Sequence, residues 1–257
     1  MSRVRLPGVR MSRTARLRWG AVSVALSAAL LGWLLMATEV WTAVLTRLFP
    51  GQPDVLYTTA SLTELTVRHL QIVAASSTLT VSVGLPLGIW ATRPSGREFR
   101  DLIAAAVDFG QTFPPVAVLA LAMPVFGLGL YPAIAALFLY GLFPVVSSTI
   151  AGLEGVPPAV LDAARGMGMG RWRILGQVEL PLAARVIMAG IRTSVIINVG
   201  TATVASFVGA GGLGDPIIGG LNVLNNAWVL QGALVAAALA VLLDSALGLV
   251  ESALAPL

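Results

Sequence analysis

Six long apolar runs dominate this sequence and restrict the folds that it can adopt. A helix needs about 20 mostly apolar residues to cross the hydrocarbon core of a bilayer. In lipid, every backbone polar group must also be paired within its own segment. Runs of suitable length predict transmembrane helices over residues 20–38, 70–92, 102–126, 132–153, 184–208 and 228–250. We therefore expect an all-α, polytopic membrane protein with about six spans.

The residue types that the chain lacks exclude several kinds of chemistry. There is no cysteine, and all 16 basic residues are arginine. Without lysine the chain has no Walker A loop, whose lysine holds nucleotide phosphates. His69 is the only histidine, which excludes histidine-cluster metal sites. We expect no catalytic residue, no metal site and no cofactor in this chain, so that a partner or an ion gradient must supply any energy.

The positions of the arginines predict which ends of the spans face the cytoplasm. Fourteen of them lie before the first span, between the second and third, or between the fourth and fifth and at its start, whereas only Arg47 and Arg68 lie on the other side. Cytoplasmic loops carry such an excess of basic residues. Both termini are then expected to be cytoplasmic, in a multi-pass protein of a cell membrane. The basic N-terminus is expected to face anionic lipid rather than nucleic acid.

This orientation divides the chain into a basic cytoplasmic segment, 1–19, and one transmembrane domain, 20–257. The first apolar run is longer than that of a signal peptide and has no clear cleavage site, so we interpret it as an uncleaved anchor. The segment 39–69 is predicted to be an extracytoplasmic loop, with a capping box formed by Ser61 and Glu64. Residues 209–226 are too rich in glycine for a regular span. They form either a segment that caps the outer mouth or a flexible connector.

The loop 154–183 is the largest predicted cytoplasmic loop between spans. Pro157-Pro158 favours a helix start, residues 159–165 read as helix, and Gly166 and Gly168 are expected to end it. A second short helix is expected from Arg171 to Val178, ended by Leu180-Pro181. The loop is then either a knob that binds a soluble motor or an amphipathic hairpin lying on the membrane.

The spacing within this loop resembles a family signature. Asp162-Ala163-Ala164, Gly168 and then Val178-Glu179-Leu180-Pro181 resemble the EAA motif of permease subunits in ATP-binding-cassette importers. Asp162 stands where that family most often has Glu, and Val178 where it often has Ile. Residues 111–115, 137–140, 198–203 and 209–214 extend the resemblance to permeases of osmoprotectant importers, which carry glycine betaine, choline and carnitine. Methionine importer permeases have a similar glycine-rich stretch.

The resemblance implies a type I importer permease fold and a set of partners. These are two cytoplasmic ATPase subunits that bind ATP and Mg, a second identical or paralogous permease, and an extracytoplasmic solute-binding protein. It also implies that Asp162, Ala163, Ala164, Gly168, Val178, Leu180 and Pro181 couple the permease to the ATPases. A permease for another small solute such as methionine, a gradient-driven transporter or channel, and a non-transporting scaffold remain alternatives.

Polar residues within the spans are the remaining candidates for function, because they are costly in lipid. We expect Arg192 to pair with either Asp108 or Asp244; the alternative is that all three reach interfacial water. Weakly polar side chains suited to line a solute path are Gln111, Thr112, Asn198, Thr201 and Thr203. The alternative is that they join helices to one another. Trp90 and Tyr140 are candidates for cation–π contacts or for anchors at span ends.

Overall fold

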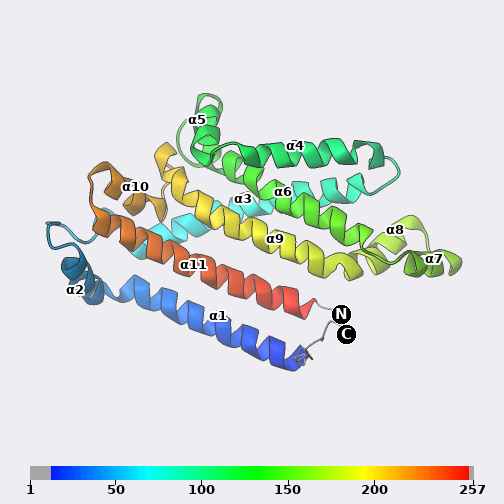
Figure 1. The fold of residues 1–257 in the computed structure, drawn as a ribbon, viewed down its shortest axis with the longest axis horizontal. Helices are drawn as coiled ribbons and strands as arrows, with labels where there is room; N and C mark the ends of the chain where they lie inside the picture. Colours follow the sequence, from blue (N-terminus) through cyan, green and yellow to red (C-terminus); the bar gives the residue numbers. More distant parts are fainter. Residues whose placement is uncertain (1–12, 255–257) are drawn as a thin grey trace, which may run out of the picture.

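The computed structural model describes residues 13–254, which form a bundle of long helices with roughly parallel axes (Figure 1). The long α-helices are α1 (Arg13–Met36), α3 (Leu62–Ala91), α6 (Leu130–Glu154), α9 (Leu180–Ala202) and α11 (Asn226–Ala253). The shorter ones are α2 (Thr38–Leu48), α4 (Arg100–Thr112), α5 (Pro115–Phe126), α7 (Pro158–Gly166), α8 (Arg171–Ile174) and α10 (Gly214–Asn222). Short segments of other helix types are the 3₁₀-helices η1 (Arg97–Phe99) and η3 (Thr203–Val208) and the π-turn η2 (Leu175–Glu179).

Five helices among the described residues are long and apolar enough to cross a membrane, and a bent pair supplies a sixth crossing if it counts as one span. The all-α fold with about six spans is therefore confirmed. The basic N-terminal segment lies largely in residues 1–12, outside the described part of the chain.

Helix α6 lies at the centre of the bundle, between α3 and α9. Two glycines allow these close approaches: a Cβ at Gly190 of α9 would lie 1.7 Å from Ser148 Oγ, and one at Gly88 of α3 would lie 2.6 Å from Thr149 Cβ. Small residues at helix contacts are typical of membrane proteins, where packing rather than water drives association. Helix α1 lies outside this core and packs on α11, with Ser23 Oγ 3.0 Å from Ser245 Oγ.

The predicted third span, 102–126, is wrong as a single helix. Helices α4 and α5 meet at a bend of 99°, visible at the top of Figure 1. Phe113 and Pro114 have extended backbones, because a residue before proline avoids the α region and Pro114 and Pro115 have no N–H to donate.

The predicted outer loop, 39–69, also needs correction. It contains α2, and α3 begins at Leu62, eight residues before the predicted span. Ser61 caps the start of that long helix, since Ser61 Oγ accepts the Glu64 N–H at 3.1 Å; this is one of the two hydrogen bonds of the predicted capping box. Helix α3 extends beyond its apolar run into the more polar residues that precede it, so the apolar run alone places the start of the helix too late in the sequence.

The last correction concerns the start of the fifth span. Leu180-Pro181 does not end a helix there, because residues Arg171–Val208 form one continuous helix of 38 residues. Its η2 segment is a π-turn that ends at Glu179, two residues before Pro181. The wider turn accommodates a proline, whose ring would clash with the carbonyl four residues earlier in a regular helix. A helix of this length spans about 57 Å, well beyond the roughly 30 Å hydrocarbon core.

Candidate functional site: the loop between α6 and α9 and the helix that follows it

The loop between α6 and α9 presents an exposed surface that combines arginines with large apolar side chains. Helix α7 begins after Pro157 and ends at Gly166, and Gly168 has φ +77° in the left-handed region. The Met169 N–H closes the turn by donating to the Ala164 carbonyl at 3.1 Å. Met167 is 75% exposed and Trp172 is 83% exposed. Apolar side chains exposed on such a surface are typical of a protein interface.

The predicted coupling residues occupy different environments in this loop. Asp162 is exposed and pairs with Arg165 at 2.7 Å, and Ala163 is exposed beside it. Ala164 is buried, so it fixes α7 to the rest of the chain rather than contacting a partner. Val178, Leu180 and Pro181 lie in the π-turn and the first turn of α9. Trp172 and Leu175, three residues apart, lie in different environments: Leu175 is buried, whereas Trp172 is exposed.

An ion pair not predicted from the sequence fixes the π-turn to α3. The Arg93 guanidinium, just beyond the end of α3, donates from Nη1 to Glu179 Oε2 at 2.8 Å. Glu179 is only 8% exposed, although it is a carboxylate. A buried charge of this kind needs a partner to offset the loss of its hydration. The pair therefore ties the start of the long helix to the C-terminal end of α3.

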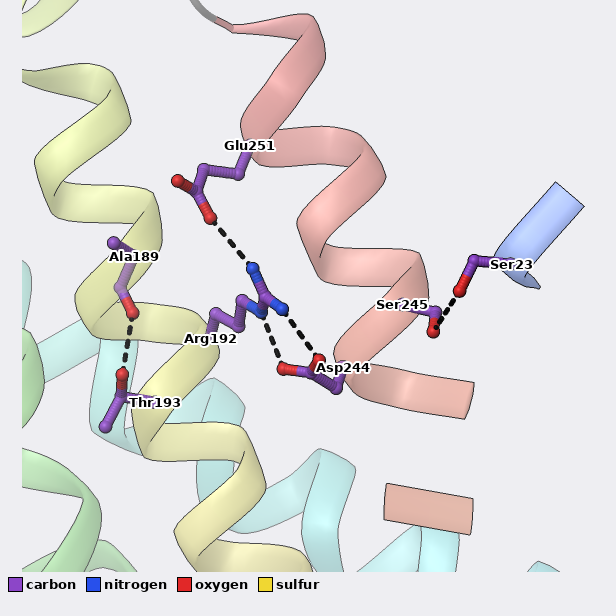
Figure 2. Close-up of polar contacts among 7 residues, drawn as sticks. All are labelled: Ser23, Ala189, Arg192, Thr193, Asp244, Ser245 and Glu251. Carbon is purple, nitrogen blue, oxygen red and sulfur yellow. Dashed lines mark hydrogen bonds and ion pairs between the residues drawn. The ribbon is translucent and has the colours of Figure 1, made fainter. Parts of the chain in front are cut away.

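Arg192 forms the centre of a charged network between α9 and α11 (Figure 2). Its guanidinium binds Asp244 through two hydrogen bonds of 2.6 Å each, and a third bond of 3.1 Å reaches Glu251. Arg185 lies 3.7 Å from the other oxygen of Glu251. The structure thus places Arg192 with Asp244 and not with Asp108, which is exposed on α4. Glu251 was missed, although it follows Asp244 by seven residues, as Arg192 follows Arg185.

An open hollow of about 370 Å³ lies beside this network. It is lined by Ala189, Arg192, Thr193, Ile196, Ile197, Asp244 and Glu251. None of the five residues predicted to line a solute path contributes to it. Its charged wall at one end and apolar wall along α9 distinguish it from the tightly packed centre of the bundle.

The predicted path residues instead contact neighbouring helices or their own backbone. Gln111 donates to the Tyr140 carbonyl of α6 at 2.7 Å. Asn198 is fully buried and reaches Ser76 and Ser77 of α3 at 3.3 Å each. Thr112 and Thr203 donate to the carbonyls of Phe109 and Gly200 in their own helices. Thr201, near the end of α9, is half-buried. In this conformation the contacts favour helix joining over a shared lining, so the path role stays a prediction.

The two aromatic candidates for cation–π contacts are engaged elsewhere. Tyr140 is buried, and its hydroxyl donates to the Phe113 carbonyl at the α4–α5 bend. Trp90 stacks on Phe99 with ring centroids 5.8 Å apart. Tyr140 thus stabilises the bend rather than anchoring a span end, and Trp90 covers the turn between α3 and α4.

Similarity to known proteins extends over most of the chain. Residues 84–256 match the family described as binding-protein-dependent transport system inner membrane component. The osmoprotectant import permease protein OsmY of Salmonella typhimurium is 41% identical over 223 residues, which cover 87% of this chain and 92% of that protein. The choline transport system permease protein OpuBB of Bacillus subtilis is 42% identical, covering 74% of this chain and 87% of that protein.

A further relative and a solved structure agree with these matches. The glycine betaine/carnitine/choline transport system permease protein OpuCB of Bacillus subtilis is 40% identical, again covering 74% of this chain and 87% of that protein. A chain of the MetNI methionine ABC transporter, in an inward-facing conformation, superimposes with a TM-score of 0.67 at 23% identity. The superposition covers 76% of this chain and 96% of the MetNI chain. At this identity the likeness shows the fold.

Proposed function

Since the chain belongs to the family of binding-protein-dependent transport system inner membrane components, we propose that it carries quaternary-ammonium compatible solutes such as glycine betaine, choline and carnitine. It is the permease subunit of an ATP-binding-cassette importer, a transport component rather than a catalyst. The solute class rests on relatives at 40–42% identity, whose names specify osmoprotectants or these three solutes. The quaternary ammonium group that these solutes share cannot donate a hydrogen bond, so a weakly polar, uncharged lining such as that predicted from α4 and α9 suits its passage.

The single observation that carries the mechanism is the continuous helix from Arg171 to Val208. One end starts directly after the exposed loop between α7 and α8, and the other reaches the opposite end of the bundle (Figure 1). A rigid element of this length transmits a displacement at the loop to the far side of the membrane, as rigid-body alternating access requires. We propose that ATPase subunits bind the loop and move this helix.

The proposed assembly contains two ATPase subunits that bind ATP and Mg, a second permease, and an extracytoplasmic solute-binding protein. A lysine-free chain cannot provide a Walker A loop, so the nucleotide must bind to partner subunits. The ion pairs Arg93–Glu179 and Arg192–Asp244 hold the long helix against α3 and α11. These contacts support a helix that moves as one body with its neighbours near the loop.

Uptake by cells that lack their own osmoprotectant importers tests the solute class. Cells expressing the chain with its ATPase and binding protein are expected to accumulate labelled glycine betaine, choline or carnitine. Uptake must stop when the ATPase is inactivated by substitution of its Walker A lysine. Accumulation of methionine in place of all three compounds would overturn the proposed solute class, and uptake that continues without ATP hydrolysis would overturn the coupling.

The orientation of the bundle is a separate prediction. Met167 is 75% exposed directly after α7, and Val223 is 62% exposed directly after α10; these two helices lie at opposite ends of the bundle (Figure 1). Because the chain has no native cysteine, Met167→Cys and Val223→Cys each create a single thiol. In intact cells a membrane-impermeant maleimide is expected to label Val223→Cys and to reach Met167→Cys only after permeabilisation. The reverse pattern would contradict cytoplasmic termini.

A further inference from the structure

The C-terminal end of the long helix, where it meets the start of α3, is no longer a regular α-helix. Helix α9 passes into the 3₁₀ turn η3, after which Gly209, Gly211 and Gly212 adopt φ values of +75°, +82° and +97°. We call residues 209–212 the glycine turn. It leads into α10, which packs against α11 and η3. A flexible connector would not combine three left-handed glycines with a buried Ala210, which is 1% exposed.

Two consecutive residues of α3 bind this end of the helix. His69 Nε2 donates to the Val199 carbonyl at 3.0 Å, and Arg68 Nε donates to the Ala210 carbonyl at 3.1 Å. The Thr203 N–H, which would bond the Val199 carbonyl in a regular α-helix, donates instead to the carbonyls of Gly200 and Thr201. Since a carbonyl can only accept, Nε2 carries the proton in neutral histidine. The two bonds therefore join α3 to both sides of η3.

The residues around these two hydrogen bonds are closely packed, so the glycine turn cannot move away from α3 without disturbing both bonds. His69 is fully buried, and a Cβ at Gly212 would lie 3.1 Å from His69 Nδ1 and 3.2 Å from its Cα. Ala210 packs in the same apolar cluster as Ile72 and Val73 of α3. Separation of η3 from α3 would thus break both hydrogen bonds and expose Ala210 together.

Buried polar atoms without a protein partner concentrate at this junction. Among the described residues, five buried side-chain polar atoms have no partner in the chain, and three of them lie here: His69 Nδ1, Asn198 Oδ1 and Ser206 Oγ. Buried polar groups are nearly always paired, and an unpaired one is costly. Because these three atoms form no hydrogen bond within the chain in this conformation, a rearrangement of the junction loses none from them.

We infer that Arg68 and His69 are positioning residues that clamp the outer end of the long helix against α3 and thereby keep the extracytoplasmic mouth closed. This inference deepens the proposed function, and the placement of the clamp on the extracytoplasmic side rests on that function. The clamp lies at the opposite end of the same helix from the loop between α7 and α8. When the loop is displaced, the helix releases the two carbonyls and the glycine turn separates from α3.

Matched substitutions distinguish the effect of losing each hydrogen bond from the effects of changing side-chain size and charge. His69→Gln retains an amide N–H close to the position of Nε2, whereas His69→Asn is too short to reach the Val199 carbonyl. Arg68→Gln retains an N–H near the position of Nε without the charge, whereas Arg68→Met removes the donor and keeps the length. Arg68 is exposed, so its variants should fold even if those at the buried His69 do not.

The readout is the reactivity of a single thiol in Ala210→Cys. The complete importer is placed in lipid nanodiscs, where a maleimide reaches both faces, and labelling is compared with that of the exposed Val223→Cys. Without ATP we expect His69→Asn and Arg68→Met to raise the labelling rate of Ala210→Cys about fivefold to tenfold, as loss of one hydrogen bond predicts. His69→Gln and Arg68→Gln should stay within about twofold of the parent.

Each outcome decides between the possibilities. Unchanged labelling in both donor-free variants would overturn the clamp. Equal increases in the glutamine variants would show that the two hydrogen bonds do not hold the helix, which also overturns it. If His69→Asn does not assemble, Arg68→Met against Arg68→Gln decides alone. The test needs no solute, so failure of betaine uptake in the parent would count against the proposed function without affecting this result.

Discussion

Gly168→Val is expected to reduce solute uptake at least tenfold while the permease remains in the membrane at its normal level. Gly168 has φ +77°, where a β-branched residue is a genuine outlier. The strain of such a residue is about 1–3 kcal/mol. Nothing lies within 4 Å of the position of a Cβ, so the turn can relax by rotating its backbone. That rotation redirects α7 relative to α8 and misplaces the exposed Met167 and Trp172.

A second glycine in the same turn provides the control. Gly170 also has open space around a Cβ, but its φ is −70° and its ψ is 160°, values that suit valine. Gly170→Val adds the same side chain two residues away without backbone strain, and uptake should stay within about twofold of the parent. Transport and ATPase activity are measured on the assembled complex. Equal losses in both variants would mean that bulk at the loop surface, rather than the turn, matters.

The conformation of the loop after α6 could be predicted because it depends on residue types within the loop itself. Prolines and glycines determine backbone geometry over a few residues, so Pro158 at the start of α7 and the left-handed Gly168 followed directly from residue type. The limit of the same reasoning is Pro181, which usually marks a helix boundary but here follows a π-turn. No local rule predicts a π-turn, because the tertiary contact of Glu179 with Arg93 helps to hold it.

The partners of the polar side chains were harder to predict because they are distant in sequence. Arg68 binds a carbonyl 142 residues away, and Arg93 binds a carboxylate 86 residues away. Depth in the membrane limited the candidates for Arg192 to two aspartates, and packing of α11 against α9 selected Asp244. Depth alone also placed Asp108 at a similar level, but it lies on an exposed face of α4. Hydropathy gives the level of a residue along a span but not the direction in which it points.

Replacement of Arg192 by Gln is expected to destabilise the membrane domain markedly. Arg192 is the only described residue that contacts both Asp244 and Glu251 with hydrogen bonds. Removing it leaves two carboxylates with Arg185 alone, 3.7 Å from Glu251. Leaving such charges unpaired costs roughly 1–3 kcal/mol or more. We expect a melting temperature about 5 °C lower in detergent, together with a lower amount of assembled permease.

The double variant Arg192→Gln with Asp244→Asn tests whether the unpaired charge is the cause. It removes one positive and one negative charge, so that Arg185 and Glu251 remain as a neutral pair. We expect it to melt higher than Arg192→Gln, although it lacks more native groups. Arg185→Gln is the control, since its side chain is 57% exposed and makes one long contact; it should change the melting temperature by about 1 °C or less. If the double variant melts lower than Arg192→Gln by the full effect of Asp244→Asn, the two helices are held by packing, and the network does not stabilise them.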